Sequence, residues 1–503
     1  MSLLRDPYAP RQLAIALAIA TTLAAQAQGN ASSDTSWIRF RADPVNRVFA
    51  DMAQTRSRPL PTARAAATWP VTNCADVGTG TLRDAVGNAA SGDTIDLTAL
   101  TCATITLQTG AIPVNLDDLT IVGPGRNALT LDGNDADRIF FHPGQGQLRL
   151  EAMTIQRGRD RATGFHVAGG GCIASAGYLV LDGATVRNCY AGGEGAYGGA
   201  IYAYSLTMAN STLSGNLGYG VHEDAGTAAF GGAAFVYTMD LVDSTVTGNR
   251  AEHLFNPGRT TYDIGGGIIT VRGGSIANST IDSNTSYGRG GGIAAFNPIT
   301  ISNSTFSGNI AQTDVAGALF LRWPATLEAN NCTITANYAQ GGGGGIWLAT
   351  SNSRLQSTLL FGNSAGASHF ADVEGRQALT IAGSHNLIGS SDLAVTLPAD
   401  TLVANPLLGP LTYNGGPTRT HALLAGSPAV NAGVNPANLP FDQRGSPFAR
   451  VHGAAPDIGA YEQQALPAPF ASTPVPTLSH WMLAMLASLL CVFSLRARNH
   501  SRR

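Results

Sequence analysis

Two acidic side chains in the sequence have the spacing of a catalytic pair. Glu151 and Asp182 each lie three residues before a threonine that recurs along the chain. If the recurring segments stack as parallel strands, the two carboxyl groups lie roughly 5 Å apart. Retaining glycosidases use two carboxyl groups at about this separation. Glu151 and Asp182 are therefore candidate catalytic residues, and the alternative is a pair of solvated acids near Arg149 and Arg187.

A second candidate site lies on the two longest loops, "LGYGVHEDAGTAAF" at 217–230 and "RAEHLFNPGRTTYDI" at 250–264. Both loops follow the same position of adjacent repeats, so their side chains could face each other across a side cleft. The mixture suits acid–base catalysis, sugar hydrogen bonding or a calcium ion. Ordinary surface decoration is the alternative. The candidates are His222, Glu223, Glu252 and His253 for catalysis, and Asp224, Tyr262, Asp263, Tyr190 and Tyr197 for binding.

The elements that must position these residues are copies of one repeat. "NSTLSGN" at 210–216 returns as "DSTVTGN" at 243–249, "NSTIDSN" at 278–284 and "NSTFSGN" at 303–309, and a Gly-Gly-x-apolar marker precedes most copies. The stretches between the markers alternate apolar and polar residues, which is strand periodicity. Units of 25 to 35 residues built from short strands favour a coil in which equivalent strands stack in parallel. The sequence therefore predicts an all-β, right-handed parallel β-helix.

Stacking gives each position of the motif a structural role. Asparagine tolerates the left-handed backbone of a corner, and its amide can donate to the identical amide one rung away. The glycine pair turns the chain where side chains on successive rungs would collide. The threonine and the apolar residue after it are expected to fill the interior. The predicted ladder consists of Asn216, Asn249, Asn284, Asn309, Asn337 and Asn363. N-glycosylation is the alternative for the Asn-Ser-Thr triplets, but it does not explain the second asparagine.

Both ends of the chain carry targeting features. Arginines, an apolar run at 13–25 and the small residues "AQA" form a secretory signal. The apolar segment 478–495, followed by four arginines, predicts a membrane helix with its arginines on the cytoplasmic side. The predicted divisions are a signal peptide at 1–27, a linker at 28–71, an N-terminal cap with first rungs at 72–136, β-helix repeats at 137–390, a C-terminal capping region at 391–462, a proline-rich stalk at 463–477 and a sorting tail at 478–503.

The cysteines fit an exported protein. An oxidising compartment permits disulfides, and neighbours along the chain suggest that Cys74 pairs with Cys102 and Cys172 with Cys189. Sequence alone leaves other connectivities open. No Cys-x-x-Cys pair or neighbouring histidine spacing predicts a metal site, so no cofactor other than calcium is expected.

The motifs resemble those of secreted right-handed β-helix proteins of the polymorphic outer-membrane repeat and choice-of-anchor Q type. "GTGTLRDAV" at 78–86 is similar to an N-terminal cap of that group, and "DQRG" at 442–445 with "DIGAYE" at 457–462 looks like its closing region. Asp442 and Arg444 are expected to form a buried structural pair there. "VPTLSHW" at 475–481 resembles the IPTL-type sorting signal. The resemblance implies a fold and an address, with a sorting protease as a partner, and no shared catalytic motif.

The net charge and the absence of lysine argue against two classes of function. A formal charge of −3 without a basic stripe gives no footprint for nucleic acid. All 30 basic residues are arginine, so the Arg-x-Lys clamp of β-helix polygalacturonases has no counterpart, and no regular aspartate cluster of the pectate-lyase kind is present. The sequence therefore predicts an envelope-anchored surface protein for adhesion, carbohydrate binding or matrix contact. The alternative is a polysaccharide lyase or glycoside hydrolase acting in a side groove.

Overall fold

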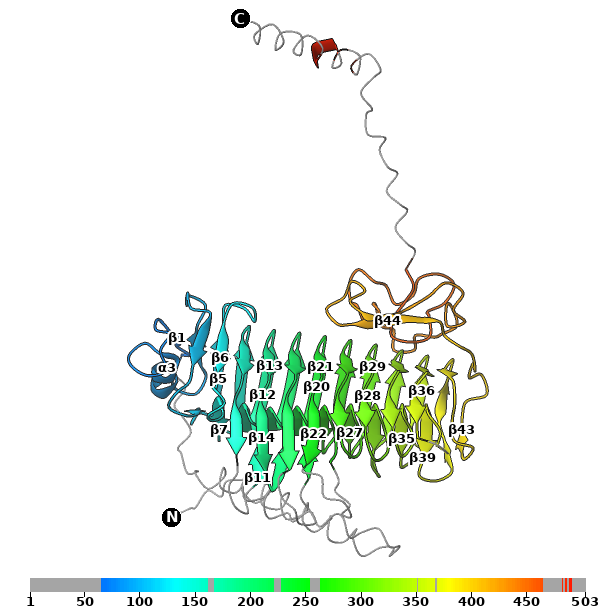
Figure 1. Ribbon diagram of the computed structural model, residues 1–503, viewed down its shortest axis with the longest axis horizontal. Coiled ribbons are helices and arrows are strands. Elements are labelled where there is room, and N and C mark those ends of the chain that lie inside the picture. Colours follow the sequence, from blue (N-terminus) through cyan, green and yellow to red (C-terminus); the bar gives the residue numbers. More distant parts are fainter. Residues whose placement is uncertain are drawn as a thin grey trace, which may run out of the picture. The chain divides into compact units, whose positions relative to one another are not determined.

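The computed structural model describes residues 65–161, 167–220, 228–253, 263–350, 352–366 and 369–464, with five positions of the tail between 482 and 490. The described residues from 65 to 463 belong to one compact unit. The body is a parallel β-solenoid in which successive turns of the chain add strands to the same three sheets (Figure 1). The predicted all-β parallel fold is therefore confirmed.

The first sheet has eleven strands, one for each turn of the solenoid. In order they are β3 (Thr104–Thr106), β6 (Thr130–Asp132), β9 (Thr154–Gln156), β13 (Thr185–Arg187), β17 (Thr212–Ser214), β21 (Thr245–Thr247), β25 (Thr280–Asp282), β29 (Thr305–Ser307), β33 (Thr333–Thr335), β37 (Leu359–Phe361) and β42 (Leu387–Ile388).

The second sheet is the largest, with nineteen strands. It contains β1 (Thr68–Pro70), β2 (Asp93–Asp96), β4 (Ile112–Pro113), β5 (Leu119–Val122), β7 (Phe140–His142), β8 (Gln147–Glu151), β12 (Ile173–Asp182), β16 (Ile201–Ala209), β20 (Ala234–Val242), β23 (Ile268–Thr270), β24 (Gly274–Ala277), β27 (Ile293–Ala295), β28 (Ile299–Ser302), β31 (Leu319–Leu321), β32 (Leu327–Asn330), β35 (Ile346–Leu348), β36 (Arg354–Gln356), β39 (Val373–Gly375) and β41 (Ala382–Ser384).

The third sheet has eight short strands, and smaller sheets complete the unit. The eight are β10 (Arg159–Arg161), β14 (Tyr190–Gly193), β18 (Leu217–Gly220), β22 (Arg250–His253), β26 (Thr285–Ser286), β30 (Ile310–Ala311), β34 (Tyr338–Ala339) and β38 (Ser364–Ala365). The smaller sheets are β11 (Val167–Gly169) with β15 (Gly195–Tyr197) and β19 (Ala229–Phe230), β40 (Leu379–Thr380) with β43 (Val395–Thr396), and the antiparallel hairpin of β44 (Leu408–Thr412) and β45 (Thr420–Leu423).

Strand alternation decides which residues fill the core. In the eleven-stranded sheet the middle residue points inward, and Val246, Ile281 and Phe306 are fully buried there. The threonine before it points outward, because neighbouring residues of a strand face opposite sides. The expectation that the threonine fills the interior is therefore wrong. Thr280, Thr305 and Thr333 are buried all the same, because another part of the chain covers that face.

The asparagine ladder is confirmed. The amide Nδ2 of Asn216 donates to Oδ1 of Asn249 at 2.8 Å, and the same bond links each asparagine to the next as far as Asn363, which donates to Asp372 at 2.7 Å. The left-handed corner belongs to other residues of the motif. Positive φ angles occur at the first Asx, such as Asn210 and Asp243, and at the residue before the ladder, such as Gly215.

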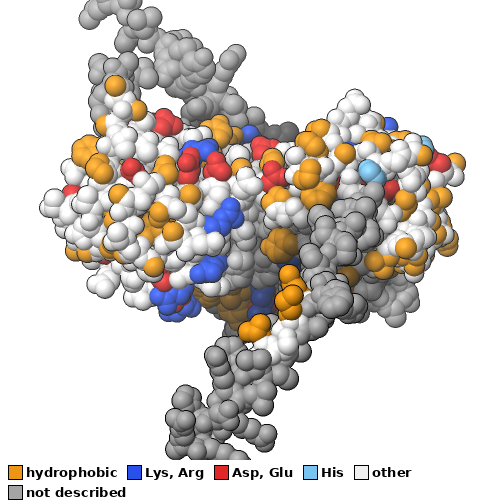
Figure 2. Space-filling model, turned by 90° about the horizontal axis from the view of Figure 1, so that it is seen from above, with side chains coloured by type: hydrophobic (Ala, Val, Ile, Leu, Met, Phe, Trp, Pro, Cys, Tyr) orange, Lys and Arg blue, Asp and Glu red, His pale blue; other side chains and the backbone are white. Residues whose placement is uncertain are grey.

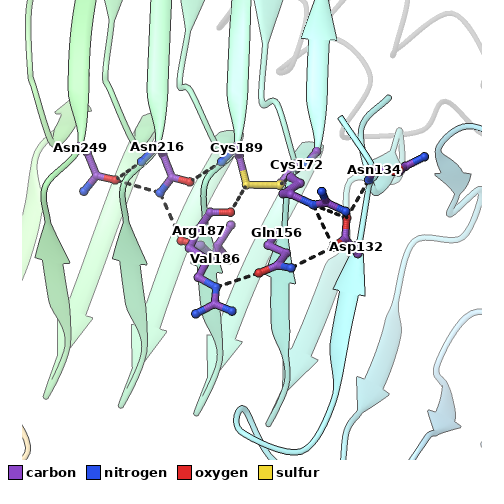
Figure 3. The surroundings of a disulfide bond; sticks show 11 residues. Asp132, Asn134, Gln156, Cys172, Val186, Arg187, Cys189, Asn216 and Asn249 are labelled. Carbon is purple, nitrogen blue, oxygen red and sulfur yellow. Dashed lines mark hydrogen bonds and ion pairs between the residues drawn. A yellow bond between two sulfur atoms is a disulfide. The ribbon is translucent and has the colours of Figure 1, made fainter. Parts of the chain in front are cut away.

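Both predicted disulfides are present. Cys74 joins Cys102, and Cys172 joins Cys189. Cys189 occupies the ladder position of its rung, and its backbone N–H donates to Oδ1 of Asn216 at 3.0 Å (Figure 3). The disulfide therefore lies where the asparagine column ends.

A short helix begins the solenoid within the predicted cap. It is α3 (Leu82–Asn88), with Thr81 as its N-cap accepting from the N–H of Asp84. The carboxylate of Asp84 in turn accepts from the N–H of Gly80 at 2.8 Å. The helix buries Leu82, Ala85 and Val86 against the first turns, as a capping element should.

Residues 405–462 of the predicted closing region pack along a flank of the solenoid, where His421 of β45 contacts Ser307 of β29 (Figure 1). Residues 391–402 instead extend the end of the solenoid through β43 and the bridge between Leu387 and Leu402. Gln443 is the main attachment to the flank, because its amide donates to Thr280 Oγ1 at 3.0 Å and its carbonyl accepts from Thr305 Oγ1 at 2.6 Å. The N–H of Ala460 donates to Thr333 Oγ1 at 3.0 Å. The outward threonines are therefore the surface to which the closing region binds.

Buried ion pairs hold the closing region together. Arg444 and Asp442 are joined at 2.6 Å with both side chains almost inaccessible, which confirms the predicted structural pair. Arg450 pairs with Glu462 at 2.9 Å, and neither side chain has any exposed surface. Burial raises the pKa of Glu462 to about 7, although the Arg450 charge acts in the opposite direction.

Candidate functional site

Glu151 and Asp182 occupy directly opposed positions of neighbouring strands, as their spacing predicts. Arg149 lies between them and forms ion pairs with both carboxylates. The hydrogen bond that Arg149 donates to the carboxylate of Glu151 is the main reason that the pKa of Arg149 is raised. Arg187 contacts Gln156 instead, at 2.9 Å. With one guanidinium held by both carboxylates, the arrangement is that of a surface ion-pair network, and the catalytic role of Glu151 and Asp182 stays a prediction.

The second candidate site brings His253 and Asp263 together. Nδ1 of His253 contacts Oδ2 of Asp263, whose Oδ1 accepts from the N–H of Ala229 at 2.6 Å. Burial raises the pKa of Asp263 more than its hydrogen bonds lower it. The ring of Tyr287 meets the histidine ring edge-on at 4.6 Å. A carboxylate that orients an imidazole is a general feature of acid–base sites.

The His253–Asp263 pair differs from a working acid–base site in that a substrate cannot reach it. The two side chains retain only 2% and 0% of their surface, so the pair is closed to a polysaccharide. Glu252 faces elsewhere and accepts from Arg250 Nε at 2.6 Å. The other candidates of these loops, His222, Glu223, Asp224 and Tyr262, lie outside the described residues.

Tyr190 and Tyr197 have packing roles. The guanidinium of Arg159 lies 4.3 Å above the ring centre of Tyr190. Tyr197 stacks on Phe230 at 5.0 Å and meets Phe235 edge-on at 5.2 Å. Burial raises the pKa of Tyr197 to about 12. The contacts of Tyr197 belong to a second apolar cluster on the outer side of the nineteen-stranded sheet. The binding roles of Tyr190 and Tyr197 stay predictions.

At the edge of this cluster lies a further surface, which shares the partly buried Tyr237 with it. Tyr178, Tyr204, Tyr237 and Arg272, here called the tyrosine face, lie on consecutive rungs. The rings of Tyr204 and Tyr237 stack at 5.6 Å, and Tyr178 meets Tyr204 edge-on at 6.0 Å. The guanidinium of Arg272 lies 5.9 Å from the ring centres of Tyr204 and Tyr237. Tyr178 is 51% exposed, and Arg272 is exposed as well.

A signal for the tyrosine face does exist in the sequence. After the glycine marker, "GGAIYAYS" at 198–205 and "GGAAFVYT" at 231–238 align their second aromatic residue in the same register. Equivalent positions of stacked parallel strands lie side by side, so two tyrosines in the same column predict stacked rings. The third tyrosine follows an irregularity in β12 between Ser175 and Tyr178, which conceals it from a simple alignment.

Histidine, cysteine and acidic side chains are scattered over the described part of the chain. Among those residues, no group of three or more histidine, cysteine, aspartate or glutamate side chains is arranged to hold a metal ion. The calcium expectation rested partly on the loop residues outside this part, so it stays a prediction.

Comparisons with known proteins identify the tail. Residues 473–500 match the IPTL-CTERM motif, which indicates an exported cell-surface protein. No curated protein sequence matches the chain. The crystal structure of pectate lyase Pel9A superposes with a TM-score of 0.37 and 14% identity, covering 80% of this chain and 97% of that chain.

The membrane segment predicted at 478–495 lies mainly outside the described residues, as do the predicted signal peptide and most of the linker. Among the described residues, no helix has the length and apolar character needed to cross a membrane.

Proposed function

We propose that this protein is a surface-anchored β-solenoid that binds carbohydrate without cleaving it, as an adhesin or matrix-binding protein. The observation that carries this proposal is the tyrosine face. Its three rings combine apolar surface with hydroxyl groups, and Arg272 adds a cation whose guanidinium donates to the hydroxyl of Tyr204 at 3.2 Å. Tyrosine suits recognition because it offers a large rigid area together with a polar end.

The surroundings of the tyrosine face also favour a polar ligand. Thr238 donates to Ser205 at 3.0 Å, and Ser275 donates to Asp240 at 2.6 Å, on strands that continue the same outer surface. A sugar chain offers apolar C–H faces for the rings and hydroxyl groups for these side chains. The repeated rungs set an interval of about 4.8 Å along the solenoid axis, so a long glycan would meet several rungs at once.

The sorting motif supplies the cellular context. We propose that the C-terminal segment anchors the protein at least transiently in the cytoplasmic membrane and that a sorting protease processes it. The proline-rich stalk would then separate the solenoid from the membrane, because such segments stay extended.

A polysaccharide lyase or glycoside hydrolase is the second candidate. The buried pair of His253 and Asp263 favours it, since a histidine oriented by a carboxylate is a common acid–base device. Use of this pair would need access for substrate, which the buried side chains do not provide.

A glycan-binding assay on the purified full chain tests the main proposal. We expect neutral or acidic polysaccharides to bind without the appearance of new chain ends. The double variant Tyr178→Ala with Tyr204→Ala should bind at least about tenfold more weakly, since interfacial tyrosines often contribute about 2 kcal/mol.

Tyr338→Ala is the matched control, because Tyr338 lies on β34 in a different sheet. Equal weakening by the control would contradict a role for the tyrosine face. New chain ends that vanish in His253→Ala would support the enzyme instead.

A further inference from the structure

A cavity of about 200 Å³ lies where the closing region meets the flank of the solenoid. The solenoid contributes Asn210, Thr212, Asp243 and Thr245, with Arg126 from an earlier turn, and the closing region contributes Tyr413, Pro417 and Arg419. Drug-sized ligands use pockets of about 300–1,000 Å³. The cavity therefore has room for about one sugar ring.

The column of outward threonines to which the closing region binds continues into this cavity. At three successive rungs the closing region engages the outward threonines. Thr280 Oγ1 donates to the carbonyl of Arg419 at 2.6 Å, and Thr305 and Thr333 bind Gln443 and Ala460. Thr245 and Thr212 follow in the same column. Their hydroxyls have no hydrogen-bond partner among the described residues, and both line the cavity.

The corner column repeats the pattern. Asn303 Nδ2 donates to the carbonyl of Phe441 at 2.8 Å, and Asn331 Nδ2 donates to that of Val434 at 3.3 Å. The equivalent side chains of Asn210 and Asp243 make no such bond within the described chain, although both have the same left-handed backbone. On one part of the flank these polar groups hold the closing region. On the neighbouring part, at Asn210 and Asp243, the equivalent groups are therefore available to a ligand.

The charges of the cavity indicate what that ligand is. Arg419 is neutralised by Asp282, to which it donates at 2.6 and 2.7 Å. Among the described residues, the guanidinium of Arg126 donates only to the carbonyl of Asn210, and neither Arg126 nor Asp243 has an ion-pair partner there. One cation and one anion remain, so the lining has no net charge. A neutral molecule with adjacent hydroxyls would receive hydrogen bonds from the guanidinium and donate to the carboxylate.

Tyr413 supplies the apolar contact. It is 66% exposed at the rim, directly after β44. An exposed aromatic ring beside hydroxyl and charged groups is suited to the apolar face of a pyranose ring. We infer that the cavity between the closing region and the threonine column binds one neutral pyranose unit of a glycan. This inference rests on the proposed carbohydrate-binding function and assigns it a second, separate site.

The test measures binding of the purified full chain, kept in a detergent without sugar headgroups, to defined ligands. The probes are methyl glycosides and neutral di- to tetrasaccharides of glucose, galactose and mannose, with oligouronates as the acidic arm. Thr212→Val combined with Thr245→Val removes two hydroxyls and keeps the branched shape. Asp243→Asn keeps the corner conformation, because asparagine occupies it at 210, 278 and 303. Tyr413→Ala removes an exposed ring.

The matched control is Thr104→Val combined with Thr130→Val, two threonines of the same column at the far end of the sheet. Each pocket variant should weaken neutral-sugar binding at least about tenfold, the usual result of losing hydrogen bonds to a polar ligand, while the control keeps wild-type affinity. Thermal unfolding of every variant verifies that the fold is intact, and Tyr413→Ala, which removes a largely exposed ring, should fold normally.

The other outcomes separate the two proposals. If glycans bind but the pocket variants match the control, the site is wrong and the proposed function stands. Binding of oligouronates alone overturns the neutral class of ligand. If the folded wild-type protein binds no saccharide in any arm, both the site and the proposed function fail.

Discussion

Each ladder asparagine satisfies its whole side chain with two neighbouring rungs. Nδ2 of Asn249 donates to Oδ1 of Asn284 at 2.9 Å and to the carbonyl of Leu213 at 3.1 Å, while its Oδ1 accepts from the side chain and backbone of Asn216. A buried polar group that loses its partner keeps its desolvation cost. Removal of one asparagine therefore leaves donors and an acceptor unpaired on both sides.

We expect Asn249→Ala to lower the free energy of unfolding by about 3 kcal/mol, since each unsatisfied buried group costs about 1–3 kcal/mol. Chemical denaturation of the purified protein measures this loss. Asn127→Ala, in an exposed turn, should change stability by less than about 0.5 kcal/mol. Similar losses for both variants would show that the ladder contributes little.

The sequence predicted the ladder and the paired position of Glu151 and Asp182 because both depend on register alone, which a repeat determines. It did not predict the direction of the threonine. Thr280 and Ile281 alternate, but both are buried, so hydrophobicity and β-propensity gave no sign of which one faces the core. Arg149 was named as a neighbour, yet its bond to both acids depends on a side-chain conformation that spacing does not fix.

At the scale of elements, the closing region depends on contacts between residues far apart in sequence. Gln443 binds threonines 163 and 138 residues away, and such partners leave no periodicity for a single sequence to show. The resemblance of "DQRG" and "DIGAYE" to a closing segment therefore predicted that the region exists and contains a buried pair. It did not predict the flank on which the region lies, or the cavity beside it.

His421 makes this attachment sensitive to acid. Its Nε2 contacts Ser307 Oγ at 2.9 Å, its Nδ1 contacts the carbonyl of Gly409 at 2.7 Å, and burial lowers its pKa. The unfolded chain binds more protons once the pH falls below about 6.5, so the contribution of His421 is present at pH 7.5 and is lost on acidification.

We expect the wild-type protein to lose about 1 kcal/mol more stability than His421→Gln between pH 7.5 and pH 5. Unfolding curves of both proteins at each pH measure the difference. His369→Gln, which changes an exposed histidine, should follow the wild type. Parallel pH profiles for wild type and His421→Gln would contradict the assignment.

At the scale of the whole molecule, the surface mixes charges of both signs. Arginine and acidic side chains are interspersed among uncharged ones on the face shown in Figure 2, and the net charge is −3. Such a surface offers a partner local hydrogen bonds and aromatic rings instead of a long-range field. Glycan binding to it should depend only weakly on salt concentration.

The disulfide of Cys172 and Cys189 connects residues 17 positions apart in sequence. Closing a loop of about this length stabilises a folded chain by about 3 kcal/mol in the entropic account. Cys172→Ser with Cys189→Ser should lower the free energy of unfolding by about that amount, measured by denaturation under oxidising conditions. A reductant, which breaks both disulfides, should destabilise the wild type by more than this amount. It should not change the stability of a variant that lacks all four of these cysteines. An unaltered denaturation midpoint in the double variant would contradict this prediction.

The attachment of the closing region also determines how the molecule bears mechanical load. The described chain leaves the unit at Gln464, just after Glu462, which is held by Arg450, and after Gly459 and Ala460, which bond to Ser357 and Thr333. Tension applied to the chain at Gln464 would therefore act first on this cluster of buried ion pairs and hydrogen bonds. The force would not act directly on the last strand of the eleven-stranded sheet, β42. The turns of the solenoid are therefore protected from unfolding one after another from that end.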